Sequence, residues 1–133
     1  MSNPPQLELF TPSPGVAAEP ERPPEPPAPA PVPDEMREIG ARLPGDLRLG
    51  TSSWSFPGWT GLVYAREAGT EVLARQGLPA YAGHPLLRTV GVDRTFYGPV
   101  PVETFRSWAA SVPEDFRSLV KAHEALTLFR FPL

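Results

Sequence analysis

Proline is concentrated in the first quarter of this 133-residue chain, where it rules out regular secondary structure. Twelve of the 20 prolines precede Met36. Each proline removes a backbone donor and fixes φ, so neither helices nor interior strands form at this density. The tract from Pro20 to Pro33 favours an extended, solvated polyproline II backbone, and it has too few apolar residues to offset the entropy of ordering. We therefore predict a disordered, acidic, proline-rich tail over residues 1–33.

Charge divides at nearly the same place. Residues 1–38 carry seven acidic and two basic residues, whereas residues 39–133 carry eight acidic and ten basic residues. Neither part has the strongly basic character of a nucleic-acid binder. The chain has no cysteine, which excludes disulfides and thiol chemistry. No secretory signal is present at the N-terminus, and no apolar run approaches the length of a membrane span, so the cytoplasm is the expected location.

After the tail, the pattern of apolar residues predicts alternating strands and helices. Residues 34–45 read as a short helix and linker, with Asp34 as a possible N-cap and Pro44-Gly45 as the stop. Strands are expected at 47–51, 86–92 and 116–122, helices at 69–81 and 102–111, and loops at 52–60 and 93–101. This alternation is typical of βαβ units, which make a parallel sheet with right-handed crossovers.

Three segments carry recognisable motifs in the order of the predicted elements. They are Gly50-Thr51-Ser52-Ser53-Trp54 with Trp59 and Tyr64 following, Thr95-Phe96-Tyr97 leading to Trp108, and Pro113 with Phe116 and Val120-Lys121. Together they resemble the YecE-like family (domain of unknown function 72) from residue 46 to about residue 127. The resemblance implies a TIM-barrel-like fold without an established activity. The chain departs from the family at Gly91 and Asp93, where relatives often have Glu and Asn, and at Leu128, where relatives frequently have His.

Size limits how much of such a barrel can be present. Residues 46–133 amount to about a third of the roughly 250 residues that a (β/α)₈ barrel takes. We therefore expect an α/β domain over 46–133 that is the N-terminal portion of a barrel, truncated before it closes.

Functional groups of barrels lie at the carboxyl ends of the strands and in the loops that follow them. That rule selects Lys121, Asp93 and Tyr97 as candidate catalytic residues. Lys121 is the only lysine among twelve basic residues, and a buried amine could serve as a base or nucleophile. The candidate ligand-binding residues, selected by the same rule, are Thr51, Ser52, Ser53, Trp54 and Thr95.

Each candidate also has a structural interpretation. The hydroxyls of Thr51 to Ser53 could cap a local turn, and Trp54 could pack over the barrel rim. Asp93 could form an ion pair with Arg94 or Arg88, and Lys121 could form one with Asp93. Tyr97 could pack its ring in the core.

The reaction is not encoded in any recognisable pattern. There is no phosphate-binding loop, dinucleotide fingerprint, zinc spacing or nucleophile elbow, so no metal site is predicted, and no residue pattern identifies a cofactor or an oligomeric state. Three interpretations remain open: an enzyme acting on a small polar or phosphorylated ligand, a non-catalytic barrel that binds a ligand or protein, and an inactive truncated product.

Overall fold

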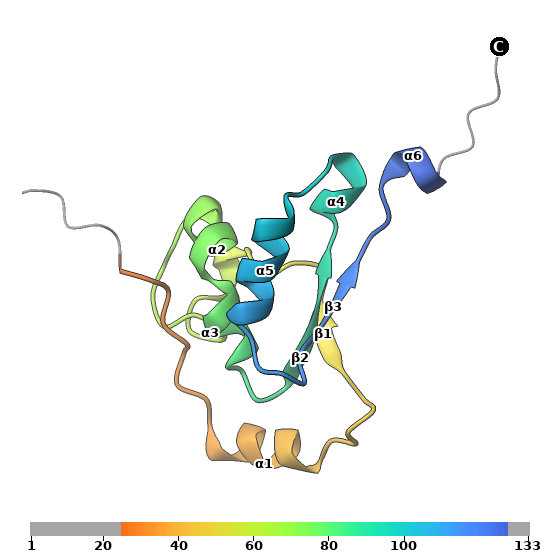
Figure 1. Ribbon diagram of the computed structural model, residues 1–133. Coiled ribbons are helices and arrows are strands. Elements are labelled where there is room, and N and C mark those ends of the chain that lie inside the picture. The colour runs from red at the N-terminus through yellow and green to blue at the C-terminus, as the bar shows by residue number, and fades with distance from the viewer. Residues whose placement is uncertain (1–24, 128–133) are drawn as a thin grey trace, which may run out of the picture.

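The computed structural model describes residues 25–127, which form an α/β unit around one three-stranded sheet. Figure 1 shows the strands with helices beside them and short helices above their tips. The elements in chain order are α1 (Asp34–Arg42), β1 (Leu49–Thr51), η1 (Pro57–Trp59), α2 (Thr70–Gln76), α3 (Leu78–Ala82), β2 (Leu87–Val92), α4 (Arg94–Tyr97), α5 (Val102–Ala110), β3 (Arg117–Val120) and α6 (Glu124–Thr127).

The sheet is parallel throughout, as the alternation of strands and helices predicted. Its order is β1-β2-β3, and both neighbouring pairs run parallel. Among the described residues the sheet is open and does not close into a barrel. The fold class predicted from the sequence is therefore confirmed at the level of an α/β parallel sheet.

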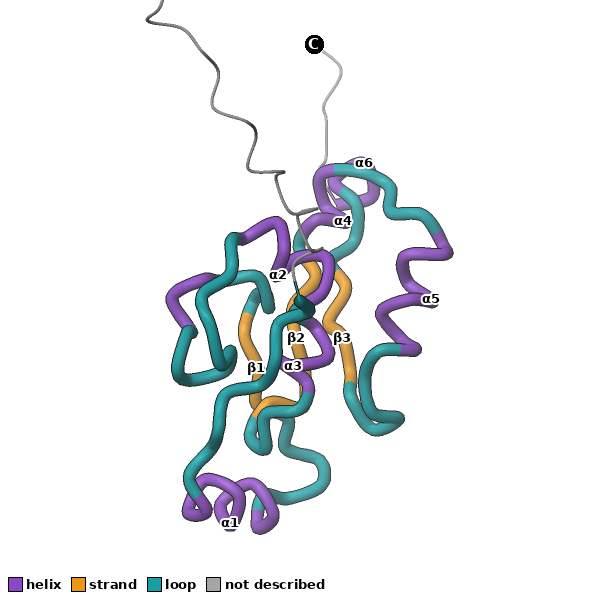
Figure 2. Tube along the Cα trace, turned by 90° about the vertical axis from the view of Figure 1, so that its left-hand side faces the viewer, coloured by secondary structure: helices purple, strands orange, loops and turns teal. Residues whose placement is uncertain are grey.

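One face of the sheet holds the core. The side chains of Val90 and Val92 point to this face and are buried, and Leu73, Tyr64 and Tyr81 complete the fully enclosed centre. Figure 2 shows α2 and α3 in front of the strands on this side, with α5 beside β3. Apolar burial on this scale supplies most of the stabilisation of a small unit.

The opposite face is bare within residues 25–127. Leu119 on β3 retains 75% of its accessible surface, and Thr89 and Gly91 on the same face of β2 are only partly buried. Parallel sheets are normally covered on both faces, so this open face is unusual for a parallel sheet.

Two sequence-predicted elements were wrong in detail. The single helix expected over 69–81 is two helices that meet at Gly77. Pro79, which interrupts the rough apolar stripe of this segment, lies in the first turn of α3, and its missing N–H prevents α2 from continuing through it. The loop expected over 93–101 contains α4.

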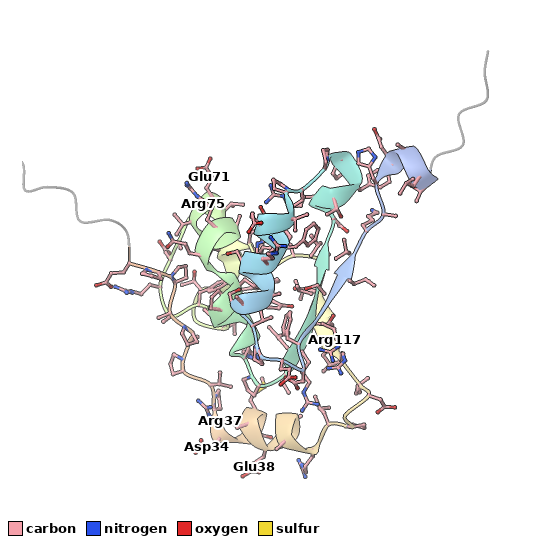
Figure 3. The ribbon with its side chains drawn as sticks, in the orientation of Figure 1. Asp34, Arg37, Glu38, Glu71, Arg75 and Arg117 are labelled. Atoms are coloured by element: carbon pink, nitrogen blue, oxygen red, sulfur yellow. The ribbon has the colours of Figure 1, made fainter. Side chains whose placement is uncertain are left out.

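The amino end of the sheet is closed by α1. Asp34 is the first residue of this helix, and Pro33, not Asp34, occupies the N-cap position. The Arg88 guanidinium donates to the Gly40 carbonyl oxygen at 2.6 Å and so ties α1 to β2. Figure 3 shows Arg117 at this end of the sheet, far from α4, and Glu71 beside Arg75 on α2.

Most of the predicted tail, residues 1–24, lies outside the described residues, and its disorder stays a prediction. The rest of the segment is described and is bound to the domain. Ala28 and Ala30 make backbone hydrogen bonds with Ala65 and Val63. Composition alone could not show this contact, since it joins residues more than thirty positions apart.

Candidate functional site

The loops that follow the three strands meet at the carboxyl edge of the sheet, where Figure 1 shows α4 and α6. Two clefts adjoin there, and Ser52, Gly91 and Asp93 line both. The larger cleft has a volume of about 570 Å³ and runs over the bare face of the sheet to Lys121. The smaller, of about 320 Å³, lies between the loop after β1 and Arg94. The carboxyl edge therefore collects polar residues from all three strands.

Strand register explains why these residues lie around the same opening at the carboxyl edge, called the mouth below. Gly50 pairs with Thr89, and Gly91 pairs with Leu119. Both glycines are required by close approach: a Cβ at Gly50 would lie 2.0 Å from the Thr89 carbonyl oxygen, and one at Gly91 would lie 3.0 Å from the Ser52 backbone. The glycines thus let the neighbouring strand and loop backbones approach closely beneath the clefts.

The loop after β1, residues 52–55, is shaped by hydroxyl groups. The Thr51 hydroxyl donates to the Ser53 carbonyl oxygen at 2.6 Å. The Ser53 hydroxyl accepts from the Ser55 amide at 3.1 Å and lies 2.9 Å from the Ser55 hydroxyl. Thr51 and Ser53 thus serve the local turn, in line with the structural interpretation. In contrast, no hydrogen bond among the described residues uses the Ser52 hydroxyl, which is exposed at the cleft.

Tyr81 anchors this loop from the core side. Its hydroxyl accepts from the Thr51 amide at 3.0 Å, lies 2.8 Å from the Thr51 hydroxyl and donates to the Thr89 carbonyl oxygen at 3.1 Å. One buried side chain therefore fixes both β1 and β2 beneath the clefts. Sequence reasoning missed Tyr81, because nothing in the sequence indicates that a helix residue reaches the strand backbones.

Trp54 lies in the core, although it also lines the smaller cleft. It is 6% exposed, its indole N–H donates to the Leu73 carbonyl oxygen at 3.1 Å, and its ring meets Trp108 edge to face at 5.3 Å. This position matches the packing interpretation of Trp54. A bound ligand would reach little of the indole.

The charged residues of the mouth are not engaged with one another. Asp93 does not form the ion pair that was considered with Arg94, Arg88 or Lys121. The ion pairs within residues 25–127 involve other side chains. The Lys121 ammonium lies 4.8 Å from the centre of the Phe96 ring, and the Arg94 guanidinium lies 5.7 Å from that of Trp108. Both contacts are cation–π interactions, which leave donor hydrogens available.

Two further candidates take different places. Thr95 is buried, and its hydroxyl donates to the Lys121 carbonyl oxygen at 2.6 Å and lies 3.0 Å from that of Val92. It joins the ends of β2 and β3. Tyr97 is 75% exposed, packs edge-on against Phe96 and lines neither cleft.

Arg94 borders the smaller cleft, although it was not selected among the candidate catalytic or ligand-binding residues. Its position directly after Asp93 at the end of β2 was a usable signal, because it follows a strand in the same way as the other candidates.

Two negative findings concern residues 25–127. No three His, Asp or Glu side chains lie together as a metal site would require. None of the helices described has the length and apolar character to cross a membrane.

A comparison of the sequence with protein families decides the family. The family described as protein of unknown function DUF72 matches residues 48–131, which is more than half of the chain. The chain belongs to the DUF72 family. The DUF72 region contains β1, β2, β3 and every residue that lines the two clefts. No curated protein and no solved structure matches the chain significantly.

Proposed function

We propose that the carboxyl edge of the sheet binds a small polar ligand that carries a phosphate group. The observation that carries the proposal is the pair of cations at the clefts: Arg94 borders the smaller cleft, Lys121 borders the larger one, and neither side chain is used in an ion pair or hydrogen bond within residues 25–127. Arg and Lys are the side chains that bind phosphate most often, Arg through its planar fork and Lys as a point charge.

The other residues of the mouth fit a ligand with hydroxyl groups. The Ser52 hydroxyl can donate to a phosphate oxygen, and the Asp93 carboxylate can accept from a sugar or polyol hydroxyl. The larger cleft, at about 570 Å³, falls within the size range of small-molecule sites. A phosphorylated sugar or polyol has both kinds of group, and it is therefore the class of ligand that the residues favour.

Catalysis is the extension of this proposal. Asp93 and Lys121 line the same cleft, so a carboxylate and an amine would face one bound ligand. Such a pair can remove and return a proton, with Asp93 as the base and Lys121 stabilising the negative charge that develops. Tyr97, the last residue of α4, stays a proposed catalytic residue.

We also propose that the three strands are the opening part of a TIM-barrel-like fold. The strands are parallel, α2, α3 and α5 lie on one face, and the larger cleft lies on the other. Barrels have this arrangement, with helices outside and the ligand at the carboxyl ends of the strands.

Binding of glucose 6-phosphate, measured by calorimetry with glucose as the uncharged comparison, tests the ligand class. Lys121→Gln and Arg94→Gln should each weaken glucose 6-phosphate binding by roughly tenfold, because each removes a charge-assisted hydrogen bond. Lys121→Arg should also weaken binding and leave the melting temperature nearly unchanged, because the larger planar group does not replace a compact amine.

Arg106→Gln is the matched control. Arg106 lies on α5, pairs with Glu103 and lines neither cleft, so its substitution removes one positive charge at a distance from the site. Equal affinities for the Arg106, Arg94 and Lys121 variants would contradict the proposal, and so would equal binding of glucose and glucose 6-phosphate.

A further inference from the structure

The proline-rich segment 25–33, called the strap below, is held against the domain by backbone hydrogen bonds. The Ala30 amide donates to the Val63 carbonyl oxygen and the Ala65 amide donates to the Ala28 carbonyl oxygen, both at 2.9 Å. Pro29 therefore lies opposite Tyr64 in an antiparallel bridge. A solvated polyproline segment would make no such bonds, so the strap is part of the folded unit from Ala28 onward.

Burial at one strap residue supports specific docking. Ala30 is 5% exposed, although its neighbours in the strap are more open to solvent. The ion pair between Glu25 and Arg66, at 2.6 Å, is exposed on both sides and adds little. Ala30 and the two hydrogen bonds are thus the contacts that hold the strap.

Tyr64, the residue opposite the strap, reaches the site loop. It is almost completely buried, and its hydroxyl donates to the Trp54 carbonyl oxygen. Burial, together with the nearby Tyr81, raises the pKa of Tyr64, so the hydroxyl stays a donor at any ordinary pH. Trp54 lies between Ser53 and Ser55, and its indole N–H is bound to Leu73. The loop that carries Ser52 is therefore fixed at Trp54 from two sides.

We propose that the strap positions the site loop through Tyr64. By holding the backbone of residues 63–65, the strap fixes where the Tyr64 hydroxyl lies, and that hydroxyl holds the Trp54 carbonyl and with it the loop 52–55. Tyr64 is a positioning residue, and the strap is a distant element of the site. The relevance of the loop to a ligand rests on the proposed function, whereas the coupling between strap and loop does not.

Hydrogen exchange measured by NMR on the full chain tests the coupling. Ala30→Asp places a carboxylate at a buried position and should release the strap, which speeds exchange of the Ala65 amide. The proposal expects exchange of the Trp54 indole N–H and the Ser55 amide to rise as well, by roughly fivefold, the equivalent of one net hydrogen bond. Tyr64→Phe should speed the same two loop positions and leave the Ala65 amide unchanged.

Two further variants separate release of the strap from loss of a surface charge and from unfolding of the whole domain. Glu25→Gln breaks only the exposed ion pair and should change none of these rates. Ala30→Pro removes the N–H bound to Val63 without adding charge, and it replaces Ala30→Asp if that variant unfolds. The Lys121 amide, bound to the Val92 carbonyl oxygen at 3.2 Å, reports whether the sheet is intact.

The outcomes separate the two proposals. Faster exchange of the Ala65 amide without faster exchange of the Trp54 indole N–H and the Ser55 amide would overturn the coupling. The coupling would also be overturned if these two loop positions exchanged at the wild-type rate in the Tyr64→Phe variant. If the loop opens as expected but the wild-type chain binds no glucose 6-phosphate, the proposed function fails and the coupling stands.

Discussion

Tyr81→Phe removes one hydroxyl from the core and leaves the ring in place. The ring packs near Trp59 and Phe116, with centroids 6.0 and 6.3 Å away, and those contacts survive the substitution. What is lost is the hydroxyl that accepts from the Thr51 amide and donates to the Thr89 carbonyl oxygen. The variant therefore isolates the polar connection between α3 and the two strands beneath the clefts.

The magnitude follows from the groups left without a partner. Tyr81 is fully buried and Thr51 is half-buried, so water replaces the lost bonds poorly. A buried donor or acceptor left unsatisfied costs about 1–3 kcal/mol. We expect the free energy of unfolding to fall by about 2 kcal/mol, which for a unit of this size lowers the melting temperature by roughly 8–16 °C.

Urea unfolding followed by tryptophan fluorescence measures this change. The dependence of the free energy on urea should keep its slope, because the surface exposed on unfolding is unchanged. Tyr97→Phe is the matched control: its hydroxyl is exposed and makes no hydrogen bond within residues 25–127, so its effect should stay within about 0.5 kcal/mol. A Tyr81→Phe variant as stable as the Tyr97→Phe variant would refute the reasoning.

Two further predictions concern stability. Gly50→Ala should lower the free energy of unfolding by about 1–3 kcal/mol, because its Cβ would lie 2.0 Å from the Thr89 carbonyl oxygen, whereas Gly98→Ala has open space and should be neutral in the same urea assay. The folded pKa of Tyr64 is raised above its unfolded value of 10.0, so the stability that this residue contributes is complete below pH 10.0 and is lost as the pH rises further. Urea unfolding at a series of alkaline pH values checks this, and Tyr64→Phe should show a shallower loss above pH 10.0; an identical loss in both proteins would contradict it.

The sequence predicted the sheet because its signals are local. Alternating apolar residues at 47–51 and 86–92 mark strands, and Val90 and Val92 on one face marked the side that is buried. The break at Gly77 was missed although Pro79, which lacks the N–H that a continuing helix needs, is a local signal for it. The four-residue helix α4 is too short to show a helical period.

The site residues stay a prediction. Ser52, Asp93 and Lys121, selected because functional groups of barrels follow the strands, do line one cleft. The use of the Thr51 hydroxyl inside the loop depends on tertiary contacts that no spacing reveals, and so does the docking of Ala30. Local sequence patterns do not indicate which distant segments of the chain contact one another.

An NMR titration of the isotopically labelled chain with glucose 6-phosphate shows whether the carboxyl edge of the sheet binds a phosphorylated ligand, because it reports where the ligand lies. We expect saturable amide shifts at Ser52, Gly91, Asp93, Arg94 and Lys121, with glucose alone producing much smaller changes. Shifts confined to the amino end of the sheet near Arg117, or no saturable shift at any concentration that leaves the chain folded, would contradict it.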